Sequence, residues 1–154
     1  MFQWTFSLPP EPVASWSNFL SSNPEAMIGF STLGPRTFHQ LQTSFTAAYL
    51  QVGLPPRRHV LPFPATTLWE RLYPSARVET EEIRITYPSV QAFLRAIKYA
   101  GADCASTRPT PIPREVYLRM CEYYATHFPA PQQAGIQVTY EAVYVILTDL
   151  SAHG

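Results

Sequence analysis

The spacing of apolar residues along the chain switches between a period of two, typical of strands, and a period near 3.6, typical of helices. Helical spacing occurs in residues 13–22, 38–48, 68–72, 90–97 and 114–128, and Ser89 is a candidate N-cap for the helix at 90–97. Alternation or a short apolar run occurs in residues 2–7, 26–30, 82–87 and 138–147. We therefore predict an α/β fold in the order strand, helix, strand, helix, short helix, strand, helix, helix, strand.

The stretch of residues 26–38 is the unit around which the rest is arranged. Its apolar run breaks at Ser31 and Thr32, turns at Gly34-Pro35 and leads into a helical pattern. This pattern predicts a buried strand, covered on both faces, that delivers a polar pair to its carboxyl end. Ligand sites in open α/β sheets lie just beyond such ends, so Ser31 and Thr32 are candidate binding residues. The alternative is that they only satisfy backbone groups at the turn.

Composition limits the function classes. With 154 residues, 46% of them hydrophobic, the chain is long enough for one domain with its own core. Formal charge is zero, so no attraction to nucleic acid or to an anionic membrane is indicated. The positive charge lies late, because no basic residue precedes Arg36. Two cysteines and four histidines at no metal-binding spacing predict no metal site, reduced thiols and a cytoplasmic location.

Four phrases of the sequence carry a family resemblance. They are FQW (residues 2–4), GFSTLGPRTFHQL (29–41), YPSVQAFLRAIKYAGA (87–102) and VTYEAVYVI (138–146). In this order and spacing they resemble the malonyl-[acyl-carrier protein] O-methyltransferase family of biotin synthesis, which is a class I S-adenosylmethionine-dependent methyltransferase family. The resemblance implies the carboxyl-terminal half of a Rossmann-like sheet whose last strand is inserted antiparallel. It also implies one partial domain, 1–154, with a helical lid or substrate region at about 55–75 and 88–130.

The resemblance further implies S-adenosylmethionine as the cofactor. Its methyl-bearing end would lie near Gln3 and Trp4, with Ser31 and Thr32 across the cleft. The acidic, Gly-rich cofactor motif of the family's first half is not found in these residues. We therefore expect the chain to be inactive until it is joined to a missing amino-terminal half. Without the resemblance, Trp4 is equally explained as a core residue with Gln3 as its solvated neighbour.

Methylation of a malonyl carboxylate needs little acid-base chemistry, so we assign no catalytic residue. The carboxylate instead needs a cation, and arginine is suited to bidentate capture. The cationic candidates for substrate binding are Arg57, Arg58, Arg36, Arg95 and Lys98. Tyr140 is a further candidate because it stands in the family phrase VTYEAVYVI, although a tyrosine in a strand is more often a packing residue. Arg57 and Arg58 are favoured because they lie in an irregular stretch, although a solvated surface is the common alternative. Lys98 is a candidate contact for an acidic acyl-carrier protein, whose docking should depend on salt.

A non-enzymatic hypothesis stands beside the methyltransferase hypothesis. Residues 1–6 would form an unprotected edge strand, which invites pairing with another chain. The chain would then be a truncated remnant or a protein-binding module, partnered by a second copy or by a different protein.

Overall fold

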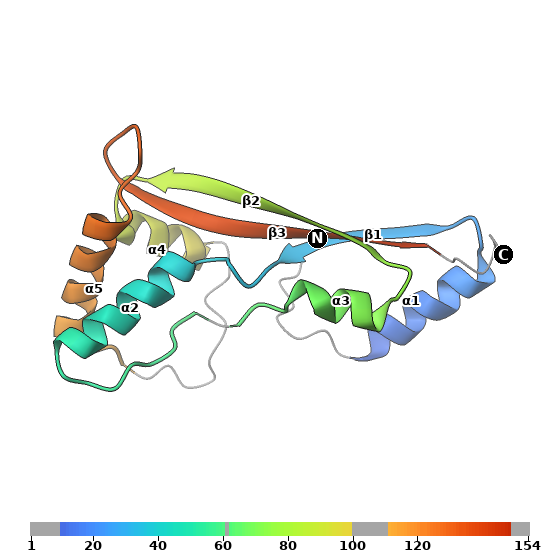
Figure 1. The fold of residues 1–154 in the computed structure, drawn as a ribbon, viewed down its shortest axis with the longest axis horizontal. Coiled ribbons are helices and arrows are strands. Elements are labelled where there is room, and N and C mark those ends of the chain that lie inside the picture. The colour runs from blue at the N-terminus through green and yellow to red at the C-terminus, as the bar shows by residue number, and fades with distance from the viewer. Residues whose placement is uncertain (1–9, 61, 100–110, 149–154) are drawn as a thin grey trace. The chain divides into compact units, whose positions relative to one another are not determined.

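The computed structural model describes residues 10–60, 62–99 and 111–148, and its helices and strands follow the predicted order (Figure 1). The elements are α1 (Pro10–Ser22), β1 (Met27–Leu33), α2 (His39–Gln51), α3 (Thr66–Leu72), β2 (Arg77–Tyr87), α4 (Val90–Tyr99), α5 (Arg114–His127) and β3 (Ile136–Thr148). The predicted α/β class is therefore confirmed. The strand predicted at residues 2–7 lies outside the described residues. No helix within the described ranges is both long and apolar enough to cross a membrane.

The described strands form one sheet in the order β1-β3-β2, so the last strand in sequence lies between two earlier ones. β1 and β3 are antiparallel, from Met27 opposite Thr148 to Leu33 opposite Ala142. The apolar character of residues 138–147 fits the burial of β3, because its side chains are buried or partly buried at every position except the exposed Tyr144. The antiparallel insertion of the last strand, which the family resemblance implied, is confirmed.

β2 pairs with the other edge of β3. The Tyr144 hydroxyl donates a hydrogen bond of 3.0 Å to Glu81 Oε2, and the hydroxyls of Tyr140 and Tyr87 are 2.9 Å apart. Residue numbers thus rise along one strand and fall along the other, which is the antiparallel arrangement. Among the described strands β2 lies at an edge of the sheet, which agrees with the alternation of apolar and polar residues in 82–87.

Two strand predictions were wrong in detail. β1 is not covered on both faces, since its burial alternates and Met27 is 66% exposed. It runs through Ser31 and Thr32 to Leu33, so the polar pair lies at its carboxyl end as predicted, and its whole length is paired with β3. β2 begins at residue 77 rather than 82, because its first residues are mostly charged and conceal the strand pattern.

The chain divides into two compact units that we describe separately. Unit 1 comprises Met1–Pro35, Phe63–Glu82 and Glu141–Gly154, and unit 2 comprises Arg36–Pro62 and Ile83–Tyr140. The predicted single domain and the predicted lid, at about 55–75 and 88–130, stay predictions.

Unit 1 is held together by an apolar core on the sheet. The buried core residues are Leu20, Trp69, Tyr73, Val143, Val145 and Leu147. Phe30 of β1 lies between two indoles, with ring centroids 5.1 Å from both Trp16 and Trp69. Such edge-to-face and tilted ring contacts add to the area-dependent hydrophobic stabilisation.

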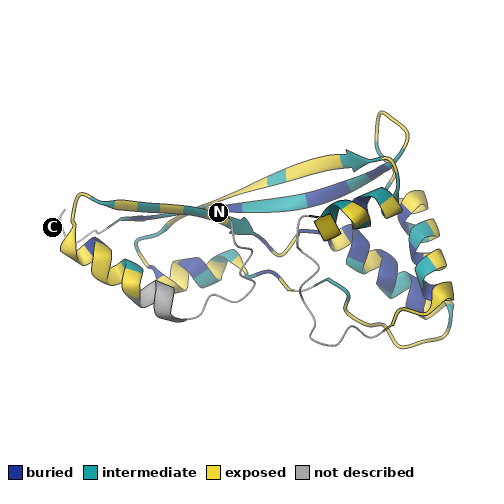
Figure 2. Cartoon of the chain, turned by 180° about the vertical axis from the view of Figure 1, so that it is seen from behind, coloured by how far each residue is buried: buried dark blue, intermediate teal, exposed yellow. Residues whose placement is uncertain are grey.

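Unit 2 buries one side of α2 against α5 (Figure 2). Its fully buried apolar residues include Ala48, Tyr49, Phe93, Val116, Met120 and Tyr124. A polar pair is buried with them, because the Gln40 amide exchanges two hydrogen bonds with Thr139, at 2.5 Å to Oγ1 and 3.2 Å from the backbone N–H. Satisfying both groups of the pair avoids the large cost of an unpartnered buried amide.

α4 begins as the sequence predicted. The Ser89 hydroxyl accepts a hydrogen bond of 3.1 Å from the Ala92 backbone N–H, which makes Ser89 the N-cap. Phe93, in the first turn, is fully buried.

Gly135, which precedes β3, has φ of 128° and approaches the Tyr87 carbonyl so closely that a Cβ would collide with it. Only glycine combines that backbone angle with that approach.

Candidate functional site

The structure describes only two of the four residues predicted for cofactor binding. Gln3 and Trp4 lie outside the described residues. Ser31 is exposed opposite Tyr144, and Thr32 is half-buried opposite Val143. Both hydroxyls therefore belong to a paired strand in unit 1, not to a loop beyond a strand end, and their cofactor role stays a prediction.

The residues predicted for substrate binding all fall in unit 2. Arg36 is exposed before α2, and its carbonyl accepts a hydrogen bond of 2.9 Å from His39 Nδ1. Lys98 is exposed in the last turn of α4, and Arg95 is exposed one turn earlier. Arg57 and Arg58 are exposed in the irregular stretch after α2. Ser31 and Thr32 thus lie in one unit and the cationic candidates in the other.

Residues 57–60, which we call the arginine loop, are attached to α2 by one side chain. Gln42 Oε1 accepts hydrogen bonds from the backbone N–H groups of His59, at 2.9 Å, and Val60, at 3.1 Å. Its Nε2 donates to the Arg57 carbonyl at 3.3 Å. One amide therefore binds three backbone groups that are 15 to 18 residues away in sequence.

A second attachment comes from the His59 ring. It packs on Phe45, with centroids 4.2 Å apart, and stacks on Tyr49 at an interplanar angle of 6°. The Tyr49 hydroxyl is hydrogen-bonded to His59 Nε2 at 2.9 Å. Burial lowers the pKa of His59, and the charge of Arg57 lowers it further, because both disfavour the imidazolium. His59 is therefore a neutral packing residue at pH 7.

Tyr140 lies in an aromatic cluster rather than at a free surface. Its ring contacts Phe38 edge-on with centroids 5.0 Å apart, and Phe38 in turn contacts Phe93 at 5.3 Å. Phe38 has a left-handed backbone, with φ of 58°, just before α2. Burial and, after it, the hydrogen bond to Tyr87 raise the pKa of Tyr140, whose hydroxyl is thus already engaged with that of Tyr87.

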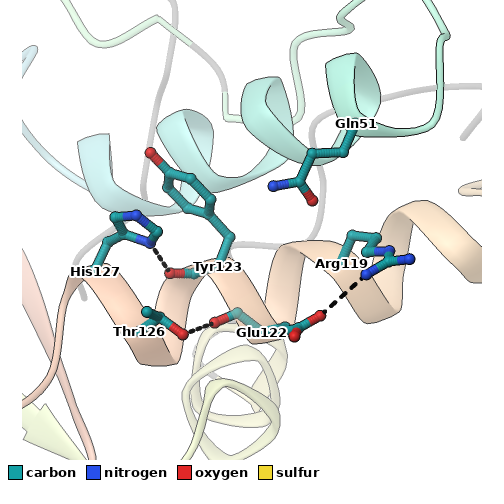
Figure 3. A pocket seen from close by; sticks show the side chains of 6 residues that line it. All are labelled: Gln51, Arg119, Glu122, Tyr123, Thr126 and His127. Atoms are coloured by element: carbon teal, nitrogen blue, oxygen red, sulfur yellow. Dashed lines mark hydrogen bonds and ion pairs between the residues drawn. The ribbon is translucent and has the colours of Figure 1, made fainter.

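An open depression lies beside α5 and the end of α2. Its lining residues are Gln51, Arg119, Glu122, Tyr123, Thr126 and His127 (Figure 3). The Arg119 guanidinium is 3.5 Å from the Glu122 carboxylate, and the His127 ring stacks on Tyr123 with centroids 3.8 Å apart. The charges of the ion pair offset each other and the His127 ring rests on Tyr123, so we assign no ligand to this depression.

Charge separates the two units. Within the sequence ranges of unit 2, arginine and lysine outnumber aspartate and glutamate by nine to three; within those of unit 1 they are outnumbered by two to eight. The zero net charge of the chain therefore hides a basic unit and an acidic unit. A basic unit attracts anions at long range, and that attraction weakens as salt rises.

The described residues do not by themselves fit the cofactor or a metal ion. The resemblance implies an acidic, Gly-rich loop for S-adenosylmethionine, and the six glycines of the sequence form no such loop. In the part of the chain that the structure describes, no three or more histidine, cysteine, aspartate or glutamate side chains come together as metal ligands.

Comparison with known proteins identifies relatives along nearly the whole chain. A malonyl-[acyl-carrier protein] O-methyltransferase of Brevibacillus brevis is 35% identical over 150 residues, which are 94% of this chain and 52% of the relative. Proteins of the same name from Halalkalibacterium halodurans and a Paenibacillus species are 31% and 32% identical over 95% and 91% of this chain. The predicted resemblance is confirmed. No model of a protein family matches the chain.

The chain spans about half the length of the curated relatives that it matches. Such a match is consistent with the predicted carboxyl-terminal half, and the antiparallel middle strand agrees with the late part of a class I methyltransferase sheet. Sequence reasoning singled out Arg57 and Arg58, whose substrate role stays a prediction, but missed Gln42, Phe45 and Tyr49, which hold their loop. Their spacing of three and four residues was the available signal, although a glutamine on a helix is usually solvated.

Proposed function

We propose that this chain forms the carboxyl-terminal part of an S-adenosylmethionine-dependent methyltransferase that methylates the free carboxylate of a malonyl thioester in biotin synthesis. The observation that carries the proposal is the similarity to the Brevibacillus brevis malonyl-[acyl-carrier protein] O-methyltransferase over 94% of this chain. The position of β3 supports it as well, because a last strand inserted antiparallel between its predecessors is a specific feature of the fold.

The part of this chain in the reaction is to hold the substrate. A carboxylate is already ionised at neutral pH, so it needs orientation and charge stabilisation rather than a base. Arg57 and Arg58 suit this role because both guanidinium groups are exposed and, within the described residues, neither forms an ion pair with an acidic side chain. Arg36, Lys98 and Tyr140 are further candidates.

Cofactor binding in this proposal requires residues beyond the 154 of this chain. Ser31 and Thr32, together with Gln3 and Trp4, would contribute one side of the cofactor site, and the acidic, Gly-rich segment would come from an amino-terminal half. Calorimetric titration of S-adenosylhomocysteine into the 154-residue chain tests this division. We expect no binding, and micromolar affinity would mean that the chain builds a complete site.

The acyl-carrier protein is the proposed macromolecular partner, as in the names of the relatives. The basic character of unit 2 supports docking of an acidic protein, with Lys98 as a peripheral contact. Raising the ionic strength from about 0.1 M to about 1 M shortens the screening length from about 10 Å to about 3 Å, so it should slow association strongly. Surface plasmon resonance with immobilised malonyl carrier protein measures this. A rate constant that does not change with salt would contradict the docking proposal.

Methyl transfer by a chimera tests the whole proposal. The part of the Brevibacillus brevis relative that lies outside the match, which in this proposal is its amino-terminal half, is joined to residues 1–154. Transfer of a labelled methyl group from S-adenosylmethionine to malonyl carrier protein is then measured. We expect transfer by the chimera and none by either part alone.

Two controls make the chimera experiment decisive. The intact Brevibacillus brevis enzyme shows that the assay works, and S-adenosylhomocysteine binding by the chimera shows that the cofactor site has assembled. A chimera that binds S-adenosylhomocysteine but does not methylate malonyl carrier protein would contradict the proposed substrate.

The alternative of a protein-binding module that pairs through residues 1–6 concerns residues outside those described. It stays a prediction. Sedimentation equilibrium tests it, because the alternative predicts concentration-dependent association that is lost when residues 1–6 are removed.

A further inference from the structure

The attachment of the arginine loop to α2 follows a helical stripe. Gln42, Phe45 and Tyr49 are separated by three and four residues, so their side chains project from the same face of α2. Gln42 binds the loop backbone, while Phe45 and Tyr49 hold the His59 ring. One face of one helix therefore determines the path of residues 57–60.

The hydrogen bonds from the Gln42 side chain to the arginine loop all go to backbone groups, so they do not involve the side chains of Arg57 and Arg58. Gln42 Nε2 donates a hydrogen bond to the Arg57 carbonyl, and Oε1 accepts hydrogen bonds from the backbone N–H groups of His59 and Val60. Thr46 Oγ1 accepts the remaining amide hydrogen at 3.3 Å, which keeps the Gln42 side chain oriented. Every polar group of Gln42 is thereby engaged in holding this segment.

Holding the backbone lowers the entropy that an exposed loop would lose on binding a ligand. When two adjacent arginines lie in a loop that is not held in place, binding a ligand costs conformational entropy of both the backbone and the side chains. In this loop the backbone is already ordered, and His59 keeps a neutral ring beside Arg57 because its pKa is lowered. What remains to be ordered on binding is the guanidinium groups themselves, whose planar fork matches a carboxylate.

We propose that Gln42 is a positioning residue for an anion site formed by Arg57 and Arg58, and that the group taken there is the carboxylate of the substrate. This inference rests on the proposed function, because it assigns the substrate carboxylate to the arginine loop. Gln42 itself does not touch the substrate. Its effect is exerted through the backbone of residues 57–60.

The test uses Gln42→Met, which keeps the length and packing of the side chain but removes its hydrogen bonds. Thr43→Ala is the matched control, because Thr43 is the next residue of the same helix and is exposed. Malonate is titrated into the 154-residue chain, and NMR follows the guanidinium Nε–H signals of Arg57 and Arg58. We expect Gln42→Met to weaken malonate binding about fivefold or more, since loop ordering must then accompany binding. Thr43→Ala should bind as the parent does.

Amide hydrogen exchange supplies the readout of positioning. In Gln42→Met the amides of His59 and Val60 should exchange faster, while the amide of Tyr49 within α2 keeps its protection. Unchanged malonate affinity in Gln42→Met, with faster exchange at His59 and Val60, would overturn the positioning role. Failure of malonate to shift the Arg57 and Arg58 signals in the parent chain would overturn the anion site itself.

The methyltransferase chimera separates this inference from the proposed function. If the chimera is active, Gln42→Met should raise KM for malonyl carrier protein and leave kcat nearly unchanged, and Thr43→Ala should change neither. An inactive chimera together with malonate binding at Arg57 and Arg58 would reject the proposed reaction but retain the Gln42-dependent anion site. An active chimera whose KM is unaffected by Gln42→Met would reject the inference and retain the reaction.

Discussion

The two units of this chain are stabilised by different means. Unit 1 has an apolar core on a sheet, and within the described residues its largest buried side chain, Trp69, has an indole N–H without a hydrogen-bond partner. Unit 2 buries a polar pair, Gln40 and Thr139, with its hydrogen bonds satisfied. Unit 1 is acidic in sequence and unit 2 is basic.

The difference shows where specificity resides in this molecule. Apolar packing tolerates small rearrangements, whereas a buried amide pair and the Gln42 hydrogen bonds require particular partners at particular distances. Unit 2, which has the more directional interactions, also carries the cationic candidates for substrate binding. The predictions below test whether the two units respond independently.

The largest expected effect comes from Trp69→Ala in unit 1. Trp69 is 1% exposed, and truncation of a buried aromatic side chain costs about 3 to 5 kcal/mol of unfolding free energy. Urea denaturation measures this loss, and hydrogen exchange shows which amides lose protection. Leu72→Ala, at a side chain 40% exposed in the same helix, is the control and should change stability little. Equal loss of protection in α5 would mean that the units do not respond independently.

The next effect concerns the buried polar pair of unit 2. Gln40→Met should cost about 1 to 3 kcal/mol, because the Thr139 hydroxyl loses its partner while still buried. The double variant with Thr139→Val should recover part of this loss, because no polar side chain is then left unpaired. Thermal unfolding of the four proteins of the double-mutant cycle measures the coupling. A double variant whose loss equals the sum of the single losses would show that the pair does not interact.

A smaller effect is expected at the start of α4. Ser89→Ala removes the hydroxyl that accepts from the Ala92 N–H and should cost about 1 kcal/mol. Ser89→Asp should restore most of the stability, because aspartate is also a good N-cap. Chemical denaturation distinguishes the two variants. Equal loss in both would exclude capping as the role of Ser89.

The smallest effect is the pH dependence from His59. Its folded-state pKa is lower than the ordinary 6.5, so the unfolded chain binds a proton more readily than the folded chain. The contribution of neutral His59 to the free energy of unfolding is therefore complete above pH 6.5. It is lost as the pH falls from 6.5 towards the folded-state pKa. Unfolding midpoints at pH 7.5 and 5.5 measure it. His59→Phe should flatten this part of the profile, and Thr43→Ala, which removes no titratable group at an exposed position, should leave it unchanged.

Local patterns in the sequence predicted most of the elements correctly. Helix spacing and the Ser89 N-cap were correct because they depend on contacts within a few residues. The antiparallel insertion of β3 is different in kind, because no local pattern specifies it. It was predicted only from the resemblance to a family, and the strand pairing confirmed it.

The sequence by itself therefore determined the α/β class and the identity of the helices, and it pointed to Arg57 and Arg58 as candidate residues for binding a carboxylate. Only the tertiary structure decided that Ser31 and Thr32 lie within a paired strand, since strand ends depend on partners more than 100 residues away. It alone linked Gln42 to the backbone of residues 57–60 and divided the opposite charges between two units. The physical reason is the same in each case. The spacing of apolar residues reflects which face of a single helix or strand is buried, whereas hydrogen bonds between segments far apart in the sequence produce no such periodic pattern.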